Sequence, residues 1–349
     1  MMRDLRKEIG HLFMVGIPGP VLEAGTRRTL DRLHVGGVVL FRRNVTSPAQ
    51  IAALTGALHA LPSTLLVAID HEGGRVMRLD EPFTQFPAAA AVGRRGDPAL
   101  AFQIGQAMAE ELSSVGIDLN FAPVLDVHSN PANPIIGDRA FSADPAVVSA
   151  MGIALMHGLL AGGVIPCGKH FPGHGDTEKD SHVELPAVRR SRAELERTEL
   201  VPFRAAIAAG IPMLMTAHVL YPAFDADHPA TVSRAILTNL LRTELGFEGV
   251  IVSDDLEMRA ISDHGDIGTA AVASVEAGAD ALLVCQDLAR AEHAARAIED
   301  AVSEGVLARE RIGAAADRVR RLRAHRPSRH AAACSLPNLA HRALVGRFG

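Results

Sequence analysis

The densest set of chemically capable side chains lies between Lys169 and His182. This stretch reads KHFPGHGDTEKDSH and holds three histidines, two aspartates, two lysines and a glutamate. Pro172, Gly173 and Gly175 do not allow a regular helix through its first half, and a short apolar run precedes it. A polar loop that leaves a buried strand usually carries function. We therefore expect this loop to supply catalytic or ligand-binding groups.

A candidate nucleophile, Asp254, follows the apolar run 249–253. A carboxylate at the end of a barrel strand is well placed to attack the anomeric carbon of a sugar. However, Asp254 or Asp255 is equally suited to cap the following helix, which is common for a Ser-Asp-Asp sequence after a strand. Taken alone, the residue type and its position leave catalysis and helix capping both open.

An acid/base partner is offered by Asp180 and His182, which lie two residues apart near the end of the polar loop. Most glycosidases use a second carboxylate for this role. Imidazole titrates near neutral pH, so a histidine can donate and recover a proton without a large shift of its pKa. A neighbouring aspartate would orient the ring and stabilise its charged form, as in a catalytic triad. The alternative is a surface loop whose polar residues have no catalytic role.

A metal site is the main rival interpretation of the histidines. His170 and His174 have the four-residue spacing found in helical zinc motifs. Pro172 and Gly173 lie between them, so the two side chains do not share one face of a helix. No Glu directly follows His170, and no Cys pair accompanies it. Metal-dependent hydrolysis on a barrel is kept as the less favoured alternative, and we expect no metal.

Other charged residues suit a polyhydroxylated ligand. Asp70 and Arg78 stand at the two ends of the segment DHEGGRVMR, and Arg139 lies in NPIIGDRAF. Carboxylate, guanidinium and ammonium groups, that of Lys169 included, bind vicinal hydroxyls through charge-assisted hydrogen bonds. Each arginine taken singly is also compatible with a solvated loop or a structural ion pair.

The composition argues against several classes of protein. The 349 residues are 48% hydrophobic and carry a net charge of −5, with no basic patch that would favour nucleic acid. Three dispersed cysteines indicate a reducing compartment without a disulfide framework. The uncharged segment 205–224 is interrupted by two prolines and a histidine, which indicates buried core rather than a membrane span. We expect a soluble cytoplasmic protein without a signal peptide.

Short apolar runs alternate with helix-periodic segments along most of the chain. Eight apolar strands, each followed by a helical pattern, favour an α/β fold of the (β/α)8 TIM-barrel type over an open doubly wound sheet. The expected strands are 13–17, 37–41, 64–69, 118–124, 163–167, 212–216, 249–253 and 281–285. The expected helices are 5–14, 22–33, 48–61, 98–115, 144–161, 192–209, 233–245, 269–277, 288–302 and 308–324.

The positions of polar residues also favour the barrel. Asp70, Asp126, Lys169, His218 and Asp254 each come just after the apolar run of a different strand. In a barrel, the carboxyl ends of all strands meet at one face, where active sites lie. An open sheet would not bring residues from so many strands together.

We expect a single domain, with a catalytic barrel over residues 1–325 and a C-terminal tail over 326–349. Pro327 and Pro337 separate this tail from the last strong helical pattern. The residues leave open whether 340–345 docks as a short helix or is mobile. A monomer is the favoured oligomeric state.

Together these motifs resemble glycoside hydrolase family 3, and specifically its bacterial β-N-acetylglucosaminidases. The resemblance covers residues 5–320, and the motifs fall in the family's order. It rests on AIDHEGGRVMRL (68–79), FAPVLDV and NPIIGDRAF (121–141), KHFPGHGDTEKDSH (169–182) and GFEGVIVSDDLEM (246–258).

The resemblance implies a role for each matched position. Asp254 would be the nucleophile that forms a glycosyl-enzyme, His182 the acid/base and Asp180 its partner. The implied substrate is a terminal β-1,4-linked N-acetylglucosamine, usually joined to anhydro-N-acetylmuramic acid peptides in cell-wall recycling. The family implies no metal or organic cofactor. The positions that fall where the family holds the sugar are Asp70, Arg78, Arg139, Lys169 and His170.

The implied mechanism is double displacement with net retention. A broader-specificity β-glycosidase and a phosphorylase stay open, the latter because a neutral imidazole would not repel an incoming phosphate. A non-catalytic sugar-binding barrel is a further class, although the sequence retains both candidate catalytic groups. Gly173 and Gly175 are interpreted as hinges that let His182 swing toward the glycosidic oxygen.

Overall fold

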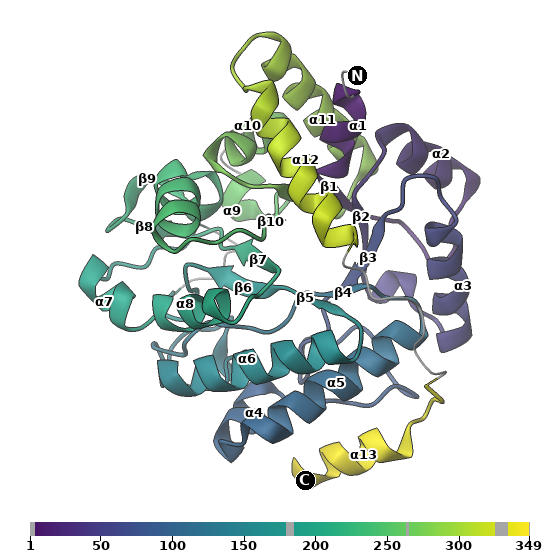
Figure 1. Cartoon of the computed structure of the whole chain (residues 1–349), viewed down its shortest axis with the longest axis vertical. Coiled ribbons are helices and arrows are strands. Elements are labelled where there is room, and N and C mark those ends of the chain that lie inside the picture. The colour runs from purple at the N-terminus through teal and green to yellow at the C-terminus, as the bar shows by residue number, and fades with distance from the viewer. Residues whose placement is uncertain (1–3, 179–184, 263–264, 325–333, 349) are drawn as a thin grey trace.

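The computed structural model describes residues 4–178, 185–262, 265–324 and 334–348. Within these ranges, nine strand segments form one parallel sheet that helices surround (Figure 1). Neighbouring segments follow the order β5-β4-β3-β2-β1-β11-β10-β7-β6. The segments are β1 (Phe13–Gly16), β2 (Gly37–Leu40), β3 (Leu66–Ile69), β4 (Leu119–Asn120), β5 (Ile165–Pro166), β6 (Gly168–Phe171), β7 (Met213–Thr216), β10 (Val250–Asp255) and β11 (Ala281–Val284).

The first and last segments of this order, β5 and β6, are two halves of one strand, separated only by Cys167. β5 pairs with β4 and β6 pairs with β7, so one stretch of chain joins both ends of the sheet. The Cys167 amide donates to the carbonyls of Asn120 and Ala122, which carries the pairing across the break. We call residues 165–171 the seam. The ring therefore has eight strands, and the predicted (β/α)8 barrel is confirmed.

Strand side chains alternate between two cores, since successive residues of a strand point to opposite faces. Val39, Met213 and Leu283 point into the barrel, whereas Val38 and Leu214 pack against the helices in a larger outer core. Every residue of β1, β2, β3, β7 and β11 is buried. Burial on both faces explains the continuous apolar runs of the sequence.

Several outer helices begin where Ser or Asp precedes Pro. Ser47 Oγ accepts the amide of Gln50, and the carboxylates of Asp97 and Asp144 cap the next helices in the same way. The helices are α1 (Leu5–His11), α2 (Ala24–Leu33), α3 (Pro48–His59), α4 (Ala89–Arg95), α5 (Pro98–Ser114), α6 (Pro145–Ala161), α7 (Arg192–Arg197), α8 (Leu200–Ala208), the wider η4 (Ala235–Glu244), α9 (Arg259–Ser262), α10 (Ile267–Ala277), α11 (Leu288–Ser303), α12 (Arg309–Ala324) and α13 (Leu339–Val345). The remaining elements are an antiparallel hairpin, β8 (Leu220–Tyr221) with β9 (Asp225–Pro229), and the single turns η1 (Arg42–Asn44), η2 (Gly137–Arg139), η3 (Ala230–Val232) and η5 (Gly346–Phe348).

Two expected boundaries were wrong. The helix expected over 5–14 ends at His11, because the chain enters β1 directly afterwards. The strand expected over 118–124 pairs continuously only at Leu119–Asn120. Pro123 follows and has no amide hydrogen to give to the ladder, so regular pairing stops there.

The helix expected over 192–209 is divided at Thr198–Glu199 into α7 and α8. The uncharged segment 205–224 contains the end of α8, all of β7 and the strand β8, which agrees with its interpretation as core. Among the described residues, no helix combines the length and the apolar character that crossing a bilayer requires.

The C-terminal helix α13 lies beside α5 (Figure 1). Its His341 ring stands between two carboxylates of α5, 3.1 Å from Glu110 Oε2 and 2.9 Å from Glu111 Oε1. Glu111 is buried and also accepts the amide and the hydroxyl of Thr84. These contacts attach α13 to the outer layer of the barrel.

Candidate active site

A cavity of about 540 Å³ opens at the carboxyl ends of the strands. Apolar side chains of the inner core line part of it. The polar side chains come mainly from the segment after β3, and from β6 and β10 and the residues that follow them. Six of the predicted site residues line the cavity: Asp70, Arg78, Arg139, Lys169, His170 and Asp254. The other two, Asp180 and His182, lie outside the described residues.

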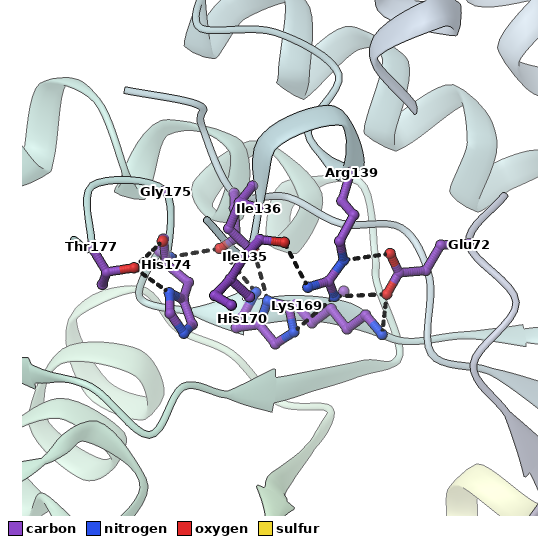
Figure 2. Close-up of polar contacts among 12 residues, drawn as sticks. Glu72, Ile135, Ile136, Arg139, Lys169, His170, His174, Gly175 and Thr177 are labelled. Carbon is purple, nitrogen blue, oxygen red and sulfur yellow. Dashed lines mark hydrogen bonds and ion pairs between the residues drawn. The ribbon is translucent and has the colours of Figure 1, made fainter. Parts of the chain in front are cut away.

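Lys169 is the centre of the most charged wall of this cavity. Its side chain, carried by β6, is only 3% exposed, and its Nζ lies 2.7 Å from Asp70 Oδ1 and 2.6 Å from Glu72 Oε1. Figure 2 shows the ammonium group directed at Glu72. A buried ammonium is stable only when paired. Both carboxylates follow β3, so the pairing ties the seam to the segment after β3, two strands away around the ring.

Two arginines complete this wall. Arg139 binds Glu72 with both prongs of its guanidinium, Nε to Oε2 at 2.9 Å and Nη2 to Oε1 at 2.8 Å (Figure 2). Arg78 Nη2 lies 3.2 Å from Asp70 Oδ2. With Lys169, the wall holds three cationic and two anionic side chains. Such a set offers charge-assisted donors and acceptors to the vicinal hydroxyls of a sugar.

The charges on this wall hold each other in the ionised state. Burial alone would raise the pKa of Asp70 and of Glu72, but nearby cations lower both below their ordinary values. Lys169 and Arg78 act on Asp70, and Arg139 and Lys169 act on Glu72. Conversely, burial disfavours the Lys169 ammonium, but Asp70 and Glu72 raise its pKa. The wall therefore stays charged at neutral pH.

His170 is oriented by a buried carboxylate. Its Nδ1 lies 2.7 Å from Asp126 Oδ2, and Asp126 Oδ1 accepts the backbone amides of His170 and His174. Burial would raise the pKa of Asp126, but His170 and these other partners lower it. An ionised carboxylate only accepts, so Nδ1 carries the proton and Nε2, 3.5 Å from Arg139 Nη2, faces the wall.

The second histidine of the predicted loop, His174, also lines the cavity. Burial lowers the pKa of His174 to about 4, so its ring is neutral at physiological pH. Its Nδ1 contacts Thr177 Oγ1 at 2.8 Å (Figure 2). His170 and His174 thus both have Nδ1 in hydrogen bonds. In the described part of the chain, no three His, Cys, Asp or Glu side chains are grouped as a metal site requires.

Asp254 lies near the end of β10 and lines the cavity. Its Oδ1 accepts the amide of Asp255 at 2.8 Å. The cavity therefore has a half-buried carboxylate on the β10 side, and the charged wall on the β3 and β6 side.

The structure shows a packing role for the two glycines of the loop, and their hinge role stays a prediction. A Cβ on Gly175 would lie 1.5 Å from the carbonyl oxygen of Val127, and one on Gly173 would lie 2.7 Å from Glu199 Cβ. The Gly173 carbonyl accepts the hydroxyl of Tyr221. Only glycine allows this close approach of backbone and neighbouring chain. The first half of the loop is therefore fixed against the barrel.

Two acidic residues of the cavity, Glu72 and Asp255, have no predicted role in the site; the sequence suggests only a helix cap for Asp255. The buried Asp126, which orients His170, is predicted only as a strand-end residue. Glu72 has the same signal as Asp70, since both belong to the short segment after β3. Its full burial between a lysine and an arginine becomes visible only in the fold.

Comparisons with known proteins show what this chain is similar to. The model of the glycosyl hydrolase family 3 N-terminal domain matches residues 4–322. A β-hexosaminidase of Thiobacillus denitrificans is 44% identical over 279 residues, which cover 78% of this chain and 77% of that protein. A β-hexosaminidase of Alkalilimnicola ehrlichii is 46% identical over 280 residues, covering 78% of this chain and 80% of that protein.

Solved structures give the same result. A family 3 β-N-acetylglucosaminidase from a Paenibacillus species superposes with a TM-score of 0.94 at 40% identity, covering 99% of this chain and 68% of that chain. NagZ from Neisseria gonorrhoeae, in complex with N-trifluoroacetyl-D-glucosamine, has a TM-score of 0.81 at 36% identity, covering 97% of this chain and 96% of that chain. Matched by the family model over most of its length and by these relatives, the chain belongs to glycosyl hydrolase family 3 and is a glycoside hydrolase that acts on carbohydrate.

Proposed function

We propose that this glycoside hydrolase is a retaining exo-β-N-acetylglucosaminidase. The observation that carries the proposal is the opposition of two features across one cavity, the Asp254 carboxylate and the charged wall of Lys169, Asp70, Glu72 and Arg139. A cavity of about 540 Å³ lies within the usual size range of small-ligand sites. Relatives named β-hexosaminidase and β-N-acetylglucosaminidase support the choice of sugar.

In this proposal the charged wall holds the terminal N-acetylglucosamine. Asp70 and Lys169 exchange hydrogen bonds with its hydroxyls, and Arg78, Arg139 and His170 complete the contacts. Because the side chains already pair with one another, little rearrangement is needed when sugar hydroxyls insert among them. The proposed role agrees with the positions that the sequence motifs mark as sugar-holding.

The chemistry would follow a double displacement. Asp254 attacks the anomeric carbon, and the bond from that carbon to the leaving oxygen breaks as His182 gives this oxygen a proton. Asp180 would orient His182 and stabilise its charged form. In the second step His182 removes a proton from water, the water oxygen bonds to the anomeric carbon, and Asp254 leaves as a carboxylate. The anomeric configuration is retained.

The natural substrate in this proposal is N-acetylglucosamine linked β-1,4 to anhydro-N-acetylmuramic acid peptides, released in the cytoplasm during peptidoglycan recycling. The motif KHFPGHGDTEKDSH and the likeness to NagZ support this assignment. We further propose that residues 1–325 form the catalytic unit of a monomer and that 326–349 is a C-terminal tail, of which α13 packs on α5.

The decisive test replaces the nucleophile. Asp254→Ala is expected to lower turnover of an aryl β-N-acetylglucosaminide by at least ~10⁴-fold, because the covalent step is lost. Asp80→Ala is the matched control, since this carboxylate is exposed, pairs with Arg42 and is not among the residues that line the cavity. Turnover of the Asp254→Ala enzyme near the wild-type rate would refute the mechanism.

The same assay separates the alternative reactions. Hydrolysis releases free N-acetylglucosamine at a rate that added phosphate and a chelator leave unchanged. A phosphorylase would respond to phosphate with a higher rate and form N-acetylglucosamine 1-phosphate. A metal-dependent hydrolase would lose activity with the chelator. Aryl β-glucosides and β-xylosides, turned over as fast as the aryl β-N-acetylglucosaminide, would indicate a broader-specificity β-glycosidase.

A further inference from the structure

β10 carries one residue more than its neighbour β11 near the cavity. Val252 pairs with Ala281 and Asp255 pairs with Leu283, so three steps along β10 match two along β11. This is the geometry of a β-bulge, which changes the direction of side chains next to it. In a regular strand, adjacent residues point to opposite faces. Here both Asp254 and Asp255 line the cavity.

Side chains of β10 replace backbone acceptors across this bulge. The Leu283 amide donates to Ser253 Oγ at 3.0 Å, and the Cys285 amide donates to Asp255 Oδ1 at 3.3 Å. Asp255 Oδ1 also accepts the amide of Glu257 at 3.1 Å. Without the Asp255 carboxyl, the Cys285 and Glu257 amides would each lose this acceptor, which costs stability at a partly buried position.

On the side of β10 that faces β7, the segment after β7 holds the backbone of Asp255. His218 is buried, its Nδ1 contacts Thr231 Oγ1 at 2.7 Å, and its Nε2 lies 2.9 Å from the carbonyl oxygen of Asp255. A carbonyl oxygen only accepts, so Nε2 carries the proton. The Asp255 amide then donates to Asp254 Oδ1 at 2.8 Å. The carboxyl and carbonyl groups of Asp255 thus fix the backbone at this point, and its amide binds the Asp254 carboxylate directly.

We propose that Asp255 is a positioning residue for Asp254: its carboxyl holds the bulged strand end from which Asp254 faces the cavity. The inference rests on the proposed function, because it takes Asp254 as the nucleophile. Asp255 itself does not touch the reacting atoms in this role. Its contribution is to fix the strand end between β7 and β11 so that the Asp254 carboxylate meets the anomeric carbon.

The protonation state of Asp255 suits an acceptor that adds no charge beside the nucleophile. Burial raises the pKa of Asp255 to about 7, and the neighbouring Glu257 and Asp254 carboxylates contribute in the same direction. Below that pH the group is a neutral acid with a carbonyl oxygen. The amide of asparagine has nearly the same shape and the same acceptor, so Asp255→Asn is a close mimic of this state.

The test compares Asp255→Ala with Asp255→Asn at pH 6. The rate of glycosyl-enzyme formation is measured by rapid quench and intact-protein mass with a fluorinated aryl N-acetylglucosaminide, and the Kd of N-acetylglucosamine is measured by calorimetry. Asp255→Ala is expected to slow adduct formation ~10²-fold, as a misplaced reacting group does, with the Kd unchanged within about twofold. Asp255→Asn is expected to recover the rate to within about fivefold, because its acceptor is intact.

Asp118→Ala is the matched control. Asp118 lies just before β4, at the amino end of the barrel, and its Oδ2 likewise accepts a strand amide, that of Val67 at 2.8 Å. Its loss is expected to lower the melting temperature without slowing adduct formation. If Asp255→Ala does not fold, Asp255→Ser, whose hydroxyl is too short to reach both amides, is expected to be slowed in the same way.

The outcomes separate this inference from the proposed function. Adduct formation by Asp254→Ala would refute the nucleophile and the inference with it. An inert Asp254→Ala enzyme together with an Asp255→Ala or Asp255→Ser enzyme that forms adduct at the wild-type rate would overturn the inference alone. An Asp255→Asn enzyme as slow as Asp255→Ala would also overturn it, since the acceptor would then not be what matters.

Discussion

Two groups of buried charges lie at opposite ends of the same barrel. At the carboxyl end, Lys169 binds Asp70 and Glu72 on the wall of the cavity. At the amino end, just before β11, Asp280 is fully buried and accepts from three arginines. Arg242 Nη2 lies 2.6 Å from its Oδ2, and Arg311 Nη1 and Arg318 Nη1 lie 3.3 and 3.2 Å from its Oδ1.

The two groups differ in what else their donors bind. Arg242 also donates to the carbonyls of Phe247 and Gly249, and Arg311 donates to those of Val275 and Ala279. Arg242 of η4 and Arg311 of α12 therefore bind backbone carbonyls on the outside of the ring, and they join these two helices to β11. The side chains of the carboxyl-end wall bind mainly one another and border open space.

The comparison shows that ion-pair chemistry does not by itself mark a functional site. Paired, buried charges at both ends satisfy the requirement that a buried charge has a partner. The two groups differ in the end of the barrel at which they lie and in whether they border a cavity. Active sites of barrels lie at the carboxyl face, whereas residues at the amino face serve stability.

The largest expected effect is on stability at the amino end. Asp280→Ala leaves three arginines without their carboxylate and is expected to lower the free energy of unfolding by ~3–5 kcal/mol. Urea denaturation measures this, and kcat of the folded enzyme is expected to stay within about twofold of wild type. Loss of activity without loss of stability would break the contrast between the two ends.

The next effect is on catalysis at the carboxyl end. Lys169→Met keeps the length of the side chain and leaves Asp70 paired with Arg78 and Glu72 paired with Arg139. We expect kcat/KM for an aryl N-acetylglucosaminide to fall ~10²-fold, equal to about 2.7 kcal/mol of transition-state stabilisation, from loss of a charged donor. Arg42→Met, which removes an exposed cation near the same end, is the control and is expected to be neutral. A Lys169→Met enzyme with unchanged kcat/KM would indicate that the wall serves stability and not catalysis.

The smallest effect concerns a charge pair outside both groups, between α13 and α5. Burial disfavours the charged ring, but hydrogen bonds and charges from Glu111 and Glu110 raise the pKa of His341 above its ordinary value of 6.5. The stabilisation is therefore complete below pH 6.5 and is lost as the pH rises through the raised pKa. We expect His341→Ala to destabilise α13 by about 1 kcal/mol at pH 6.

Hydrogen exchange of the α13 amides at pH 6 and pH 8 tests this. Faster exchange is expected at pH 8 in the wild type and at both pH values in His341→Ala, with activity unchanged. Arg342→Ala, on the same helix with an exposed side chain, is the control. Equal protection at both pH values would show that apolar packing alone holds α13.

Most of the barrel was predictable because burial on both faces leaves continuous apolar runs, as in β2, β3 and β11. Prediction failed where a single local feature overrides the pattern. Pro123 ends regular pairing after Asn120, which composition alone does not reveal. Six of the eight predicted site residues line one cavity, because the position after a strand fixes them at the carboxyl face.

The remaining site residues needed the fold. Asp255 follows Asp254 directly, and strict alternation would direct its side chain away from the cavity. Only the bulge opposite Leu283 places both in it, and the sequence has no glycine or other marker there. In the same way, close packing gives Gly175 its role, whereas the sequence alone suggested flexibility.

The seam has a consequence for how substrate and fold depend on each other. The strand that closes the ring also carries Lys169 and His170, so any loss of pairing between β5 and β4 or between β6 and β7 would displace both side chains at once. A sugar that binds them recognises only the closed ring, and it stabilises that ring by RT ln(1 + [L]/Kd). Sub-global opening of this barrel is therefore thermodynamically linked to ligand occupancy. In the proposed binding mode, the substrate therefore stabilises the closed ring that binds it.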